Sequence, residues 1–138
     1  MKQHQPITIT NGQIVTPDGM AKGSIRLVQG AIEAVGDASS QDGDEVIDAK
    51  GQLITPGLVD LGVFAIDKPA FQFGGITRAA LMPDQSPPLD FPARVRFMAL
   101  SGKPDFWVHP LAAATMALTG EELAELALMQ EAGAKAIA

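Results

Sequence analysis

The first 57 residues alternate short strand-like runs with glycine-containing turns. Residues 7–10 alternate apolar with β-branched polar side chains, and Asn11-Gly12 behind them is a typical hairpin turn. Further runs follow at 13–15, 24–28, 31–35, 45–48 and 52–55, with turns at 16–19, 29–30 and 49–51. We therefore expect hairpins that pair 24–28 with 31–35 and 45–48 with 52–55, in a small antiparallel sheet or half of a β-sandwich.

The pattern changes after Pro56-Gly57, which we interpret as the boundary between a domain at 1–57 and another at 58–138. Compact apolar runs at 58–64, 76–82 and 106–108 are typical of buried parallel strands, and 134–138 begins a fourth. Strands that alternate with helices in this way predict a parallel α/β fold.

Two helices are predicted among these strands. The first begins after Asp90, which can cap it, and has Pro92 in its first turn. The second begins at Thr119 and Glu122, which form the T-x-x-E pattern of a capping box, and ends before Gly133.

The amino-acid composition excludes several classes of function. Lys and Arg number 10 against 16 Asp and Glu, for a net charge of -6, so binding of a nucleic-acid backbone is not expected. The absence of cysteine excludes disulfides, thiol catalysis and cysteine-ligated metals. The two histidines, His4 and His109, leave few donors for a metal site.

No segment of the sequence resembles a membrane anchor. The first ten residues lack the apolar core of a signal peptide. The longest mainly apolar stretch, 111–118, is far shorter than the ~20 residues that cross a bilayer. We expect a soluble cytoplasmic protein with no membrane partner.

Several short motifs occur in a familiar order. TPGLVDL stands at 55–61, GIT at 75–77, MPD at 82–84, DFPARV at 90–95, HPL at 109–111, GEEL at 120–123 and EAGA at 131–134. In this order they resemble the amidohydrolase superfamily, and within it the dihydroorotases. The resemblance implies an α/β protein in which a small β-sandwich segment, 1–57, precedes the first strands and helices of a (β/α)8 barrel, 58–138, incomplete in this chain.

The departures from the family pattern concern the active site. Active members have two histidines after Pro-Gly-Leu-x-Asp, which bind a divalent metal, zinc, that activates water. Those positions are Gly62 and Phe64 here, and neither side chain can coordinate zinc. The family's carboxylate-binding Arg after this motif is also absent. The Asn that follows Met-Pro in the family is Asp84, which would repel an anionic substrate. The resemblance therefore implies no catalytic residue, metal ligand or cofactor within this chain.

Three polar residues remain as candidates for a vestigial pocket: Asp60, Asp84 and His109. Asp60 is either an outer contact of a metal site or a buried carboxylate bonded to backbone donors. Asp84 is either a remodelled binding residue or a turn residue. His109, at a strand end, is either a ligand or a hydrogen-bonded structural residue, and we prefer the latter. Phe64 either fills the vacated metal space or joins a contact patch.

Length sets a further expectation. A barrel of this class needs ~250 residues and eight strands. The sequence accounts for three strands and the start of a fourth, like the N-terminal third of a longer protein. We therefore expect the chain to be oligomeric or to need a completing segment, since a part-barrel leaves strand edges unpaired.

Dihydroorotase homologues that have lost these histidines assemble with aspartate carbamoyltransferase in bacteria. The resemblance therefore implies a non-catalytic structural or regulatory partner of that enzyme in pyrimidine biosynthesis. One alternative is a cyclic-amide hydrolase that uses metal ligands outside this chain. Another is a truncated fragment without a biochemical role.

Overall fold

The computed structural model describes residues 5–138, so His4 lies outside the described part. The chain divides into two compact units, Met1–Pro56 and Gly57–Ala138. Each unit has its own sheet, and we describe each by itself.

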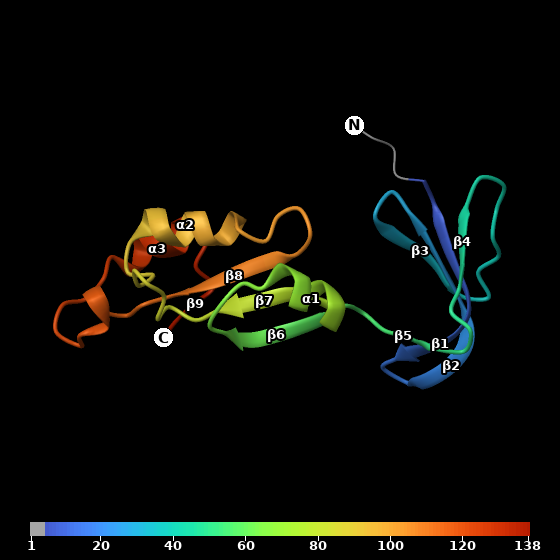
Figure 1. Cartoon of the computed structure of the whole chain (residues 1–138), viewed down its shortest axis with the longest axis horizontal. Coiled ribbons are helices and arrows are strands. Elements are labelled where there is room, and N and C mark those ends of the chain that lie inside the picture. Colours follow the sequence, from blue (N-terminus) through green and yellow to red (C-terminus); the bar gives the residue numbers. More distant parts are fainter. Residues whose placement is uncertain (1–4) are drawn as a thin grey trace. The chain divides into compact units, whose positions relative to one another are not determined.

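The first unit is one five-stranded sheet in the order β3-β2-β1-β4, with β5 also paired to β1 (Figure 1). Its strands are β1 Ile7–Thr16, β2 Gly19–Val28, β3 Ala31–Gly36, β4 Glu45–Asp48 and β5 Leu53–Ile54. The hairpin of β2 with β3 is antiparallel, as predicted, and so is the pairing of β1 with β2.

Two local predictions in this unit are wrong. Asn11-Gly12 is not a hairpin turn: β1 continues through it, with an irregularity in its pairing between Ile9 and Gly12. The runs at 45–48 and 52–55 do not form a hairpin either, because β4 and β5 each run parallel to β1. The irregularity explains both differences, since it divides β1 into two halves and each half pairs with one of these short strands.

A buried ion pair ties the sheet to the loop before β4. Arg26 on β2 donates from Nε and Nη2 to the two carboxylate oxygens of Asp44, at 2.8 and 2.9 Å. Thr8 on β1, which is fully buried, donates to the same carboxylate at 2.7 Å. Arg26 also contacts Glu33 on β3. The guanidinium holds the pKa of Asp44 well below its usual range, with the Gln41 N–H and the Thr8 hydroxyl acting in the same direction.

The second unit is a parallel four-stranded sheet in the order β6-β7-β8-β9. Its strands are β6 Leu58–Val63, β7 Ile76–Leu81, β8 Trp107–Ala112 and β9 Ala136–Ile137, and its helices are α1 Lys68–Gly74, α2 Pro92–Leu100 and α3 Leu126–Glu131, with a 3-10 turn at Met116–Leu118. This order of strands and helices, curled as at the start of a (β/α)8 barrel, confirms the predicted fold class. Within residues 5–138, no helix is long and apolar enough to cross a membrane.

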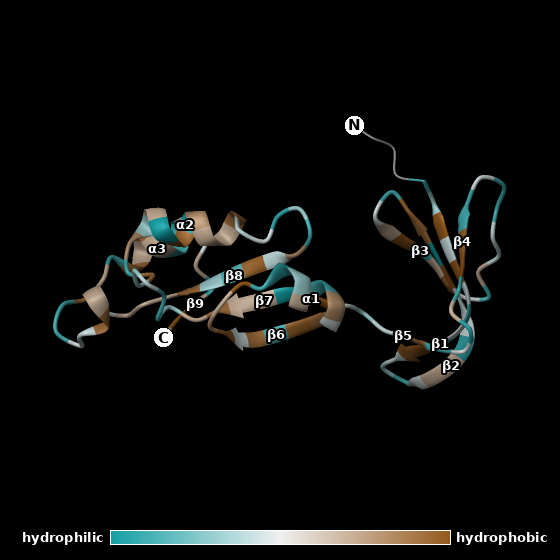
Figure 2. Ribbon diagram, viewed as in Figure 1, coloured by the Kyte–Doolittle hydropathy of each residue, from teal (hydrophilic) through white to brown (hydrophobic). Residues whose placement is uncertain are grey.

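All three helices contribute to one core on one face of this sheet. Ala79 and Leu81 of β7 and Val108 of β8 are buried there. The helices contribute Phe71, Val95 and Met129. Because side chains alternate along a strand, the opposite face carries the residues between these positions, and it has no helix packed on it. Figure 2 shows that β6 is apolar along most of its length.

The helix boundaries differ from the predicted ones. Phe91, not Asp90, is the N-cap of α2, and it makes no side-chain cap hydrogen bond. The T-x-x-E pattern does not start α3, which begins only at Leu126. The reason is local: the Thr119 hydroxyl donates to the carbonyl of Met116, and the Glu122 carbonyl accepts from the N–H of Met116, so this segment is folded back as a loop.

Candidate functional site

The two positions at which the motif order predicts metal ligands lie at the carboxyl end of β6. Gly62 belongs to the strand, and Phe64 follows it with its side chain 64% exposed. Asp60 is half-buried, and its Oδ1 accepts a hydrogen bond from the N–H of Gly62 at 3.0 Å. The Asp60 carboxylate is therefore hydrogen-bonded to its own strand, and both interpretations given for this residue stay predictions.

Neither a steric constraint nor a positive φ requires glycine at position 62. A Cβ added at this position meets no atom within 4 Å, and the residue does not have the positive φ that favours glycine. The local structure therefore accepts a Cβ at position 62.

Gln85, which the sequence analysis missed, joins the ends of β6 and β7. Its side-chain amide donates to the carbonyl of Phe64 at 3.1 Å and to that of Met82 at 2.9 Å. Asp84 beside it is exposed and makes no hydrogen bond or ion pair within residues 5–138. No sequence signal marked Gln85, because a bridging amide has no fixed spacing from its partners.

Asp90 proves to be a structural residue rather than a helix cap. It is 5% exposed, and its two carboxylate oxygens have different partners. Oδ1 accepts from Arg94 at 2.5 Å, and Oδ2 accepts from the N–H of Ala117 at 2.7 Å. The DFPAR motif thus fixes the loop that follows β8 to the start of α2.

His109 lies inside β8, apart from the other two candidates. Its neighbour on the adjacent strand is Arg78, whose Nη1 is 3.4 Å from Nε2 of His109. Burial, followed by the charges of Arg78, Lys135 and Lys103, lowers the pKa of His109 below its usual value. No hydrogen bond or ion pair in the described part of the chain links His109 to Asp60 or Asp84, so a shared pocket of these three residues stays a prediction.

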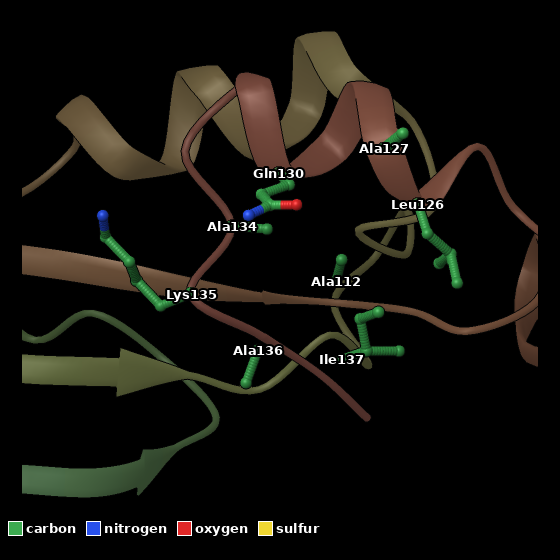
Figure 3. Close-up of a pocket in the computed structure, with 8 residues that line it drawn as sticks. All are labelled: Ala112, Leu126, Ala127, Gln130, Ala134, Lys135, Ala136 and Ile137. Atoms are coloured by element: carbon green, nitrogen blue, oxygen red, sulfur yellow. The ribbon is translucent and has the colours of Figure 1, made fainter.

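A cavity of about 420 Å³ lies between α3 and the ends of β8 and β9 (Figure 3). Its lining is mainly apolar, from Ala112, Leu126, Ala134 and Ile137, with Gln130 and Lys135 as its polar members. These side chains include no carboxylate, imidazole or hydroxyl. The one ionisable side chain in this lining is that of Lys135, and no carboxylate, imidazole or hydroxyl of the lining stands beside it to assist acid–base or nucleophilic catalysis.

The donor atoms of the second unit do not suit a divalent cation. Gly62 and Phe64 offer no ligand atom, and one oxygen of Asp60 is already bonded to the backbone. Among residues 5–138, no three His, Cys, Asp or Glu side chains converge. A zinc site needs at least three protein ligands, so the residues present do not form one.

Comparison with known proteins places this arrangement in a family. The dihydroorotase of Pelotomaculum thermopropionicum is 35% identical over 146 residues, which span 94% of this chain and 34% of that protein. The dihydroorotase of Ruminiclostridium cellulolyticum is 37% identical over 128 residues, or 82% of this chain and 30% of that protein. This chain is the N-terminal portion of a dihydroorotase-like amidohydrolase. It spans about a third of the length of these curated relatives, and no family model matches it.

Solved structures support the same fold for this dihydroorotase-like chain. An L-hydantoinase from Arthrobacter aurescens superposes with a TM-score of 0.78 at 22% identity, over 97% of this chain and 32% of that protein. A dihydroorotase crystal structure gives a TM-score of 0.70 at 15% identity, over 97% of this chain and 42% of the other. The resemblance inferred from the motifs at 55–61 and 82–84 is therefore confirmed.

Proposed function

We propose that this chain belongs to a dihydroorotase-like protein of pyrimidine biosynthesis that does not hydrolyse dihydroorotate. Its role is that of a structural or regulatory partner of aspartate carbamoyltransferase in the cytoplasm. The pathway assignment is supported by the curated relatives, which are named dihydroorotase.

The observation that carries the non-catalytic part is the pair Gly62 and Phe64 at the end of β6. Without two imidazoles at these positions, this strand end lacks the ligands that would hold a metal able to ionise water. Gly62 has room for a side chain, so the missing donor is not forced by the fold.

The partner role is supported by the exposed apolar side chains of the second unit. Leu61 is 79% exposed, Phe73 98% and Phe97 72%. These three side chains, on β6, α1 and α2, offer apolar area for contact either with other segments of a protein or with a second protein.

Co-purification tests the partner role. The 138-residue chain, tagged and mixed at micromolar concentration with aspartate carbamoyltransferase from the same source, is expected to elute with that enzyme in size-exclusion chromatography. A variant with Phe73→Ser and Phe97→Ser removes exposed apolar surface and should weaken the complex without unfolding the chain. Separate elution of the two wild-type proteins would contradict the partner role.

Metal binding tests the non-catalytic part independently. In equilibrium dialysis with zinc, the wild-type chain is expected to take up less than one zinc per chain. The variant with Gly62→His and Phe64→His should bind zinc more tightly than the wild type. One zinc per wild-type chain would contradict the non-catalytic role, because it would show that other residues of the chain hold a metal.

A further inference from the structure

A group of cations gathers on the sheet face of the second unit that carries no helix. Arg78 on β7 and Trp107 on β8 are register partners, and His109 lies two residues further along β8 on the same face. Lys103, from the loop before β8, joins them. We call Arg78, Lys103 and His109, with Trp107 between them, the cationic cluster.

Contacts in this cluster hold the side chains together. The Arg78 guanidinium carbon lies 5.5 Å from the centre of the Trp107 ring, and the Lys103 ammonium contacts the same ring. Cations are attracted to the face of an indole, so Trp107 keeps both charges close to the sheet. Arg78 Nη1 also lies 3.4 Å from Nε2 of His109.

The charges in the cluster are not balanced by carboxylates. The ion pairs of residues 5–138 join Arg26, Lys68 and Arg94 to acidic partners, but none includes Arg78 or Lys103. The charges that act on Lys103 and His109 are all positive, from Arg78 and, for His109, also from Lys103 and Lys135. Like charges brought together without a counter-ion repel one another, and this occurs in a chain whose net charge is -6.

From this arrangement we propose that the cationic cluster is a binding site for a small anion with phosphate or carboxylate oxygens. Arg78 supplies the planar fork of N–H donors that suits such oxygens, and Lys103 adds a second charge. Trp107 is 51% exposed, so the site is open to solvent in this chain. The site differs from the strand-end positions Gly62 and Phe64 and does not depend on the proposed function.

A bound anion would change the protonation state of His109. Its pKa is lowered by burial and by the cations Arg78 on β7, Lys135 just before β9 and Lys103 in the loop before β8. An anion between Arg78 and Lys103 offsets these charges, so it favours protonated imidazole and raises the pKa. The imidazole is therefore a spectroscopic reporter of binding.

The test is an NMR titration of the 138-residue chain in a chloride buffer of constant ionic strength. Inorganic phosphate is added in one arm and succinate in the other, and the His109 ring and Trp107 indole resonances are followed, with His109→Gln for assignment. We expect a saturable shift of both resonances and a higher His109 pKa in at least one arm. If only one of the two anions gives a saturable shift, that result shows whether the site prefers phosphate or carboxylate oxygens.

A pair of arginine variants distinguishes binding at a specific site from non-specific screening of positive charge by the added anion. Arg78→Gln should weaken anion binding about tenfold or more, because a hydrogen bond to a charged group is lost. Arg96→Gln changes an exposed arginine of α2 and should leave binding unchanged. Backbone amide spectra check that both variants are folded. The proposal is overturned if neither anion gives a saturable shift, or if the two variants weaken binding equally.

Discussion

At the scale of single residues, Gly62 is the position at which this chain departs most clearly from a metal hydrolase. A glycine is retained in proteins where φ is positive or where another backbone comes close, and neither applies here. Gly102 shows the opposite case, because a Cβ there would lie 2.7 Å from the carbonyl oxygen of Phe106.

This contrast gives a stability prediction. Gly62→Ala should change the free energy of unfolding by less than about 0.5 kcal/mol, as for other unconstrained surface positions. Gly102→Ala should cost about 1–3 kcal/mol, because the backbone near the buried Phe106 must shift. Urea unfolding of both variants checks this, and equal costs would contradict the steric argument.

The buried carboxylate of Asp44 predicts how the first unit responds to acid. Its pKa is held below the ordinary value by Arg26, so the folded form binds a proton less readily than the unfolded chain. Stability from this pair is therefore fully present at neutral pH and is lost as the pH falls below about 4, where unfolded Asp begins to protonate. Thermal melting between pH 7 and pH 2 should show this decline.

Three variants test whether Asp44 causes the loss of stability at low pH. Asp44→Asn leaves Arg26 with Glu33 as its remaining carboxylate partner, so the melting temperature at pH 7 should fall and its dependence on acid should become shallower. Thr8→Val removes one hydrogen bond to the same carboxylate and should act in the same direction more weakly. Asp42→Asn changes an exposed carboxylate of the same loop and is the control. An unchanged acid profile in Asp44→Asn would exclude this residue as the cause.

At the scale of elements, α1 shows how one short helix combines a core residue with an exposed one. Phe71 is 7% exposed and contacts Phe106 edge to face, with ring centres 5.1 Å apart. Phe73, two residues later, is 98% exposed. Phe64, predicted either to fill the vacated metal space or to join a contact patch, is 64% exposed in this chain.

The two phenylalanines of α1 form a matched pair for mutation. Phe71→Ala should cost about 3–5 kcal/mol, because it leaves a cavity in the core of the second unit. Phe73→Ala should cost less than about 0.5 kcal/mol, because its ring is already in water. Chemical denaturation measures both. A similar loss in the two variants would mean that Phe73 is also packed in solution.

Elements differed in how well the sequence predicted them. The apolar runs at 58–64 and 76–82 predicted the parallel strands β6 and β7, because uninterrupted apolar residues are typical of such strands. The predicted burial is wrong for β6, where Leu58, Val59 and Leu61 are exposed. The pattern of Thr119 and Glu122 predicted a helix start that is absent there, since a threonine hydroxyl can equally donate to a backbone carbonyl of its own turn. The partner of β4 was not predictable from neighbouring turns, because its pairing with β1 depends on the irregularity near Gly12.

At the scale of the whole molecule, the order of short motifs carried more information than any one pattern. It predicted the dihydroorotase-like fold, which the comparisons confirm, and it marked Gly62 and Phe64 as substituted ligand positions. It did not predict the cationic cluster, because Arg78, Lys103 and His109 meet only when β7 and β8 pair. Contacts between strands have no fixed spacing in sequence.

The measurement that tests the central claim most directly is ring opening of dihydroorotate. The protein that carries this chain, captured from its own host by an antibody to residues 5–138, is assayed with zinc in the buffer. We predict no turnover above that of buffer alone. Zinc-dependent turnover would contradict the claim, and because Gly62 and Phe64 offer no ligand atom, it would assign the metal ligands to other residues of the protein.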